Sequence, residues 1–354
     1  MKKYKGFDWI LVASAGAIFA AGLLFLFSST YPNNVDYVLR QVMWFLLGAL
    51  IFIFIINVNY RRIVGIGSIF YFLTIFLLTA VLVFGSRRLG AQRWLTIGSL
   101  NIQPSEFGKL FITLFLVQYL ASHKTYHTLK NILIPLVITL IPFVLILGEP
   151  DLGTALMLLP ILFILLYVWG APLKLLFFMI LSGVILSPLG WFLLKDYQKE
   201  RLLVFMDPSQ DPLGAGYTII QSKIAIGSGG IFGKGWLSGT QNQLNFLAER
   251  HTDFIFSVAG EEWGFLGGII LVALYGILIK RSLTIAEKTT DPCGRLLAIG
   301  LSTVIGIQVV VNISMTMGFM PVVGLPLPLV SYGGSSLLVT IMSLGLLESI
   351  AIHR

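Results

Sequence analysis

The sequence contains very little cysteine and very little charge. Cys293 is the only cysteine among 354 residues, which excludes an intramolecular disulfide, a thiolate zinc cluster and a redox-active cysteine pair. Charged residues make up 11% of the chain and hydrophobic residues 56%. A soluble domain carries roughly 25% charged residues, so this composition excludes that class. We expect an all-α polytopic membrane protein.

A concentrated basic surface is also lacking. The net charge is +8, but the lysines and arginines are scattered between apolar segments, and no basic stripe with interleaved aromatic residues occurs. The sequence therefore indicates no nucleic-acid partner, and we interpret the charge as a signal of membrane orientation. Lys2, Lys3 and Lys5 precede a long apolar run without a small-residue cleavage site, which favours a first membrane span over a signal peptide.

About ten apolar segments approach the roughly 20 residues that a helix needs to cross a bilayer. They cover residues 9–27, 38–56, 63–84, 107–120, 132–147, 152–169, 173–194, 254–279, 296–317 and 335–352. An even number of spans puts both termini on one side, and the basic residues of the termini and of alternate connections make that side cytoplasmic. We expect a single membrane domain over residues 1–354.

One polar connection, residues 195–252 between the seventh and eighth segments, is far longer than the others. Connections between packed helices usually have about 2–8 residues, and much longer ones tend to be functional or disordered. We place this loop on the extracytoplasmic side. Its middle part is too short and too rich in glycine to cross the bilayer, so we expect an interfacial or re-entrant element there. No internal repeat of the kind found in many secondary transporters is visible.

The segment FLAERHTDFIFSVAGEEWG, residues 246–264, has the densest cluster of charges at the start of an apolar helix. Asp253 lies where the polar loop meets that helix, so it either caps the helix or faces a cavity. Glu261 and Glu262 lie roughly 12–14 Å deeper, and we expect them to bind neighbouring helices. The spacing of Glu249, His251 and Asp253 matches no recognised metal motif.

Two stretches on the same side combine basic and acidic residues. Alternation around Arg93 and Trp94, followed by Gly98, predicts a small β-hairpin. Contact with anionic headgroups would explain Arg93, and a place in the aromatic belt would explain Trp94; the alternative is a cationic pocket for a phosphate-bearing lipid. Glu106 and Lys109 are three residues apart and would pair on one helix face, although Glu106 also suits a helix first turn.

Three further features have a structural and a functional interpretation. Asp151 would cap the sixth helix or contribute to a site. Residues 318–336 contain three prolines that forbid a regular helix. The small residues that follow include Ser331, Gly333 and Gly334, and backbone N–H groups there could form an anion-binding nest. Polar residues recur at every fourth position at 308, 312 and 316, which is typical of hydrogen bonds between membrane helices.

Six motifs in this order carry a resemblance to a known family: RWLTIGSLNIQPSEFGK, PDLGTA, RLLVFMDP, GYTIIQSKIAIGSGGIFGKGW, ERHTDFIFSVAGEEWGF and LPLPLVSYGGSS. The chain resembles the SEDS family (shape, elongation, division and sporulation) from the first span to the last. The segment TQNQLNFLAERHTDF resembles the rod-shape branch, RodA, more than the division branch, FtsW. Two residues depart from the family pattern: Ala248 stands where the family usually has proline, and Glu149 where it usually has glutamine. The second departure argues against a contribution of Glu149 to the site, which Asp151 could make.

The resemblance implies a peptidoglycan glycosyltransferase of the bacterial cytoplasmic (inner) membrane that polymerises lipid II during cell elongation. It also implies a class B penicillin-binding protein transpeptidase, the elongation machinery and membrane lipids as partners. Asp253 is the residue on which the family's activity depends, and a carboxylate there can act as general base. Candidate substrate-binding residues are Arg93, Trp94, Glu106, Lys109, Asp151, Arg201, Lys223, Ser331, Gly333 and Gly334.

Two other functions fit the same residues. A flippase that transports the lipid-linked cell-wall precursor would also need a cationic cavity and polar residues within the membrane. A scaffold that only recruits a transpeptidase is the third hypothesis. The sequence demands no cofactor and assigns no metal ligand, although a divalent cation, Mg or Mn, could assist at a pyrophosphate.

Overall fold

The structure, a computed structural model, describes residues 6–31, 35–88, 91–98, 100–123, 129–207 and 214–354. Within these residues, nine helices are long and apolar enough to cross a membrane. They match nine of the ten expected segments and are α1 (Trp9–Thr30), α2 (Asp36–Asn57), α4 (Gly67–Phe84), α6 (Leu129–Gly148), α7 (Leu152–Trp169), α8 (Leu173–Gly190), α12 (Ile255–Lys288), α13 (Pro292–Thr316) and α14 (Gly334–His353).

The remaining expected segment is α5 (Pro104–Ser122), which is less apolar because it carries Glu106, Lys109 and Gln118. It packs against α4, α6, α7, α13 and α14 and therefore lies inside the bundle. Glu106 and Lys109 are buried in protein, away from lipid. A central helix can thus carry a charged pair that a lipid-facing helix could not.

Three boundaries differ from the sequence prediction. The third segment is split at Ile66 into the short α3 (Tyr60–Gly65) and α4. The seventh ends at Gly190, two residues after Pro188, and continues as a 3₁₀ turn at Trp191–Leu193. The eighth runs on to Lys288, and within this polar extension Arg281 forms an ion pair with Asp8 (Nη2 to Oδ2, 2.5 Å).

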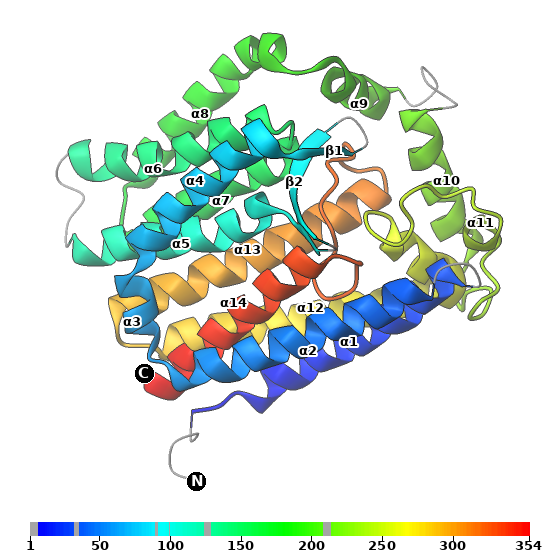
Figure 1. The fold of residues 1–354 in the computed structure, drawn as a ribbon, viewed down its shortest axis with the longest axis horizontal. Helices are drawn as coiled ribbons and strands as arrows, with labels where there is room; N and C mark the ends of the chain where they lie inside the picture. Colours follow the sequence, from blue (N-terminus) through cyan, green and yellow to red (C-terminus); the bar gives the residue numbers. More distant parts are fainter. Residues whose placement is uncertain (1–5, 32–34, 89–90, 99, 124–128, 208–213) are drawn as a thin grey trace.

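Both ends of the described chain lie at one end of the bundle (Figure 1). There the backbone N–H of Asp8, just before α1, donates to Glu348 Oε2 in α14 at 3.0 Å. The opposite end carries a three-stranded antiparallel sheet of β1 (Ser86–Arg88), β2 (Ala91–Ile97) and β3 (Leu100–Ile102). The predicted hairpin is confirmed, with a third strand added at its edge.

The long connection before α12 also lies at that opposite end (Figure 1) and contains α9 (Asp196–Met206), α10 (Ala215–Ser228) and α11 (Thr240–Gln243). Residues 208–213 of this loop lie outside the described residues. The middle part forms α10, a helix of 14 residues, which is too short to span a bilayer.

The loop after α10 is attached to a break in α12. Gly264 has φ 66° and ψ −162°, so the helical hydrogen bonds are interrupted there. The N–H groups of Phe265 and Leu266 instead donate to Gly230 O (2.9 Å) and Ile231 O (3.1 Å). The loop therefore supplies the acceptors that the broken helix lacks.

Glu261 and Glu262 hold the next part of the loop. Glu261 Oε1 accepts from Lys234 Nζ at 2.7 Å and from the backbone N–H of Gln241 at 3.0 Å. Glu262 accepts from Asn242 Nδ2 at 3.3 Å and from the Ser28 hydroxyl in α1. The hypothesis that these carboxylates lock neighbouring elements is confirmed.

We predict that Gly264→Ala destabilises the protein by about 1–3 kcal/mol, because this backbone conformation is essentially restricted to glycine. The added Cβ would also lie 2.3 Å from Gly233 N. The measurement is the thermal unfolding midpoint in detergent. Gly276→Ala is the matched control on the same helix, because its Cβ would meet no atom within 4 Å. Equal midpoints for both variants would contradict this account of the break.

Candidate active site

The backbone just before α12 is fixed at three consecutive peptide groups. The carbonyls of residues 251–253 accept hydrogen bonds from Tyr332 N (2.9 Å), Ser331 Oγ (2.6 Å) and Asn312 Nδ2 (3.0 Å), in that order. Asn312 also donates to Leu325 O at 2.7 Å. Helix α13 and the loop between α13 and α14, residues 317–333, which we call the closing loop, therefore determine where Asp253 stands.

Asp253 does not cap α12. The helix begins at Ile255, its N-cap residue is Phe254, and no side chain caps it. The capping interpretation is therefore wrong. The half-buried carboxylate of Asp253 forms no hydrogen bond within the part of the chain that the structure describes. It is available for a bound molecule.

Arg93 is the extra residue of a β-bulge. The register pairs Ser86 with Trp94 and Arg87 with Gln92, so Arg93 has no partner residue on β1. Bulges re-aim a side chain and are common next to active sites. Here the guanidinium of Arg93 lies against the α6–α7 turn, where it donates to Pro150 O and lies 3.8 Å (Nη1 to Oδ1) from Asp151.

Arg201 approaches the same place from α9. Its Nη1 donates to Val322 O in the closing loop at 3.2 Å. A cavity of about 20 Å³ separates α9, the closing loop and the α6–α7 turn. Its lining residues are Arg93, Pro150, Leu152, Gln198, Arg201, Leu202, Pro321, Val322 and Val323.

Gly324 marks the point where the charged groups converge. A Cβ on this residue would lie 3.5 Å from Asp253 Oδ2, 3.8 Å from Arg93 Nη1 and 4.0 Å from Arg201 Nη1. Its φ of 73° is in the left-handed region that favours glycine. Three residues that are far apart in sequence thus surround one position of the closing loop.

The surroundings raise the pKa of Asp253 to about 6. Burial is the main cause and the negative charge of Glu249 adds to it, whereas Arg201 and Arg93 act in the opposite direction. A general base works best when its pKa lies near the operating pH. At neutral pH the carboxylate is still mostly ionised and can accept a proton.

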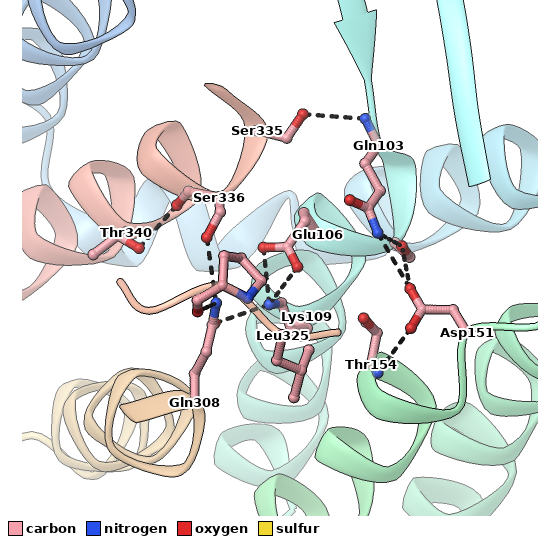
Figure 2. Close-up of polar contacts among 12 residues, drawn as sticks. Gln103, Glu106, Lys109, Asp151, Thr154, Gln308, Leu325, Ser335, Ser336 and Thr340 are labelled. Atoms are coloured by element: carbon pink, nitrogen blue, oxygen red, sulfur yellow. Dashed lines mark hydrogen bonds and ion pairs between the residues drawn. The ribbon is translucent and has the colours of Figure 1, made fainter. Parts of the chain in front are cut away.

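Asp151 is the N-cap of α7, as its structural interpretation predicts, and it also binds residues at the start of α5. Its Oδ1 accepts from Thr154 N at 3.2 Å, and its Oδ2 accepts from Gln103 Nε2 at 3.2 Å and Ser105 Oγ at 3.4 Å (Figure 2). The side chain is buried. Asp151 therefore fixes the α6–α7 turn against α5 and sets the position of Arg93.

Lys109 uses its three donors inside the bundle. Its Nζ lies 2.9 Å from both carboxylate oxygens of Glu106 and from Gln308 Oε1 (Figure 2). The pairing with Glu106 is as predicted. Gln308 Nε2 in turn donates to Pro326 O of the closing loop at 2.8 Å. In this arrangement the buried pair supports the closing loop and does not line the cavity.

The other candidate residues also lie outside the cavity lining. Ser331 donates to the carbonyl of Thr252, one of the three hydrogen bonds that hold the backbone at residues 251–253 and that we call the backbone clamp. Trp94 is half-buried beside the bulge. Lys223 packs against Gly318 at the end of α13. The N–H of Gly333 donates to Gln41 Oε1 (3.3 Å), and Gly334 packs against the indole of Trp44, so one donor of the expected anion nest is already bound by a protein group.

The described residues contain no group of three or more His, Cys, Asp or Glu side chains that could hold a metal ion. The site therefore does not fit a resident divalent cation held by protein ligands alone. Its positive charge comes from Arg93 and Arg201.

Sequence reasoning missed three contributors. Gln103 precedes a helix and follows no pattern that would single it out. Asn312 was expected to bind another helix, but its partners are Asp253 O and Leu325 O. Gly324 lies between prolines in a loop, and only the folded chain shows which side chains surround it.

Comparison with known proteins identifies the family. A model of the FtsW/RodA/SpoVE family, described as cell cycle proteins, matches residues 8–354. The chain belongs to this family. The expected family resemblance and the multi-pass helical fold are both confirmed.

Two curated members of the FtsW/RodA/SpoVE family match over most of their length. Peptidoglycan glycosyltransferase MrdB of Escherichia coli (strain K12) is 43% identical over 327 residues, covering 92% of this chain and 88% of the relative. Peptidoglycan glycosyltransferase RodA of Treponema pallidum (strain Nichols) is 35% identical over 420 residues, covering 97% of both.

Two solved structures share the fold. The rod shape determining protein RodA of Thermus thermophilus has a TM-score of 0.76 and 33% identity, covering 99% of this chain and 98% of that one. A chain from work described as "Structural coordination of polymerization and crosslinking by a peptidoglycan synthase complex" has a TM-score of 0.84 and 38% identity, covering 98% and 97%.

We predict that Lys109→Met destabilises this family member by about 3–5 kcal/mol, because it leaves the Glu106 carboxylate buried without its partner. The double variant Glu106→Gln, Lys109→Met removes both charges and should recover most of the loss. Thermal unfolding in detergent measures both effects. A double variant no more stable than the single one would show that the loss does not come from the unpaired charge.

Proposed function

We propose that this protein is a peptidoglycan glycosyltransferase that polymerises lipid II into β-1,4-linked glycan strands during cell elongation. The observation that carries the proposal is the convergence of Asp253 Oδ2 with Arg93 Nη1 and Arg201 Nη1 around Gly324. A base and two cations at one place suit a reaction in which a hydroxyl attacks and an anion leaves. The names of the family members MrdB and RodA support the same reaction.

In the proposed mechanism Asp253 accepts the proton of the attacking hydroxyl. This hydroxyl belongs to the sugar of the acceptor, and its oxygen forms a bond to the anomeric carbon of the donor. The bond from that carbon to the lipid pyrophosphate breaks in the same displacement, and the pyrophosphate leaves with the electron pair. One displacement inverts an α-linked donor to a β-linked product. Its base must therefore stand on the side opposite the leaving group.

Arg93 and Arg201 are the proposed ligands of the pyrophosphate. One guanidinium group can donate to two phosphate oxygens at once, and its positive charge stabilises the negative charge of the leaving group. Asp151 and the carbonyls of Pro150 and Val322 hold the two side chains before a substrate arrives. Positioned charges of this kind need little rearrangement during the reaction.

The cavity must open to admit this substrate, because 20 Å³ holds about one water molecule. Helix α9 and the closing loop form opposite walls, and Arg201 joins them through Val322. Helix α9 follows α8, which is the least buried span among the described residues, with 6% of its apolar window buried. We expect opening to begin with a movement of α9 away from the closing loop.

The protein is a multi-pass membrane protein, and we propose the bacterial cytoplasmic membrane with both termini in the cytoplasm. At the end of the bundle that carries the N-terminus, Arg281 pairs with Asp8 just before α1, and Arg61 pairs with Asp291 just before α13. The positive-inside rule expects basic residues of this kind on a cytoplasmic face. The site at the opposite end then faces outward, where glycan strands are assembled.

A transpeptidase of the class B penicillin-binding protein type is the proposed protein partner, together with the elongation machinery. The similar chain from a peptidoglycan synthase complex supports a partner that performs crosslinking. Polymerisation and crosslinking act on the same strand, so a physical association would deliver the product of one reaction to the other.

We predict that Asp253→Asn lowers the rate of glycan formation by about 10²–10⁴-fold, the usual contribution of a general base. Purified protein in detergent receives lipid II, with and without the transpeptidase, and glycan length is measured. Glu287→Gln makes the same chemical change at an exposed position at the far end of α12 and should keep the parent rate. No polymer from the parent protein under either condition would favour a flippase or a scaffold instead.

The pH dependence of the reaction should show an acid limb near pH 6, because protonated Asp253 cannot act as a base. Glu249 raises the pKa of Asp253, so Glu249→Gln should move this limb to lower pH. The rate of lipid II consumption across a pH series measures both. A limb that stays in place, or moves to higher pH, would contradict the assignment of the limb to Asp253.

A further inference from the structure

Glu149 is an acidic side chain that the proposed mechanism does not use. It lies in the turn between Gly148, the end of α6, and Leu152, the start of α7. The residue is 0% exposed. Neither of its carboxyl oxygens has a hydrogen-bond partner in the described part of the chain. A buried acid without a partner calls for an explanation.

An ionised carboxylate is very unfavourable in such a place, because it loses its hydration and gains no hydrogen bond in return. The neighbouring charges do not compensate for this loss. Asp151, two residues further on, is negative, and the guanidinium of Arg93 is already engaged by Asp151 and by Pro150 O. Burial and Asp151 together raise the pKa of Glu149 to about 9, with Arg93 opposing them.

Helices α4, α5 and α7, which pack beside this turn, add no unpaired charge in the part of the chain that the structure describes. Helix α4, which approaches Gly148 through Leu82, contains no Asp, Glu, Lys or Arg, and neither does α7. On α5, Glu106 and Lys109 are paired with each other. The charge state of Glu149 therefore depends on Asp151 and Arg93.

We propose that Glu149 is held as a neutral carboxylic acid, and that this neutrality keeps the positive charge of Arg93 available to an anionic substrate. With Glu149 neutral, the carboxylate paired with Arg93 at the α6–α7 turn is that of Asp151, at 3.8 Å. Ionised Glu149 would add a carboxylate of the same turn near the guanidinium and weaken its attraction for a pyrophosphate. Glu149 is thus a positioning residue that acts through Arg93, and the substrate part of this inference rests on the proposed function.

The neutral state can be tested without any activity assay. In the unfolded chain the carboxyl ionises near its ordinary pKa of 4.5, whereas the folded chain keeps the proton up to about pH 9. The folded state therefore loses stability relative to the unfolded state as pH rises between these values. Glu149→Gln cannot ionise, so its unfolding midpoint should exceed that of the parent by a margin that grows from about pH 5 to about pH 8.

Two further variants secure this test. Glu149→Met also cannot ionise and should show the same growing margin, which guards against a folding defect specific to the amide. Glu287→Gln changes an exposed carboxylate, so its margin should stay near zero at every pH. A margin for Glu149→Gln that does not grow with pH would overturn the proposal, because Glu149 would then be ionised in the folded protein.

The effect on Arg93 is tested by the kinetics. For the parent enzyme, KM for lipid II should rise severalfold above about pH 9, with a smaller change in kcat, because ionised Glu149 weakens binding of the anion. Glu149→Gln should remove this rise. An equal rise in both proteins would show that Glu149 does not control the charge of Arg93. A parent without polymerase activity would instead refute the proposed function and leave the unfolding result intact.

Discussion

The position of Asp253 depends on hydrogen bonds to the backbone around it. Three consecutive carbonyls, of residues 251–253, are held by Tyr332, Ser331 and Asn312. Because the peptide groups beside it are fixed, the carboxylate of Asp253 keeps its place without a hydrogen bond to any of the described residues. A side chain fixed through its backbone keeps its own oxygens free for a substrate, and such preorganisation is a requirement of efficient general-base catalysis.

The closing loop connects this clamp to the rest of the site. It provides Gly324, around which Asp253, Arg93 and Arg201 converge. Hydrogen bonds from Lys109 to Gln308 and from Gln308 to Pro326 O connect the loop to the buried charged pair on α5. The charged residues therefore fall into two groups. Asp253 and the arginines surround Gly324, where we propose that the substrate binds, and the pair on α5 supports the loop that contains Gly324.

The sequence was sufficient for the helices but not for every contact. Long apolar runs and a turn glycine at Gly98 predicted the spans and the hairpin, because both depend on local pattern. The same approach missed the break at Ile66, although Gly65 and Gly67 flank it and glycine weakens a helix. It also could not assign Lys223, Gly333 and Gly334, whose partners are, in that order, Gly318, Gln41 and Trp44 from distant segments. The family resemblance selected Asp253, and the bulge at Arg93 became visible only in the strand register.

A structure of the protein with bound lipid II tests the central claim most directly. The account predicts pyrophosphate oxygens on the guanidinium groups of Arg93 and Arg201, with the cavity opened between α9 and the closing loop. It also predicts a sugar hydroxyl within hydrogen-bond reach of Asp253, which is about 2.6–3.2 Å between heavy atoms. A pyrophosphate bound at Lys223, with no substrate hydroxyl near Asp253, would contradict it.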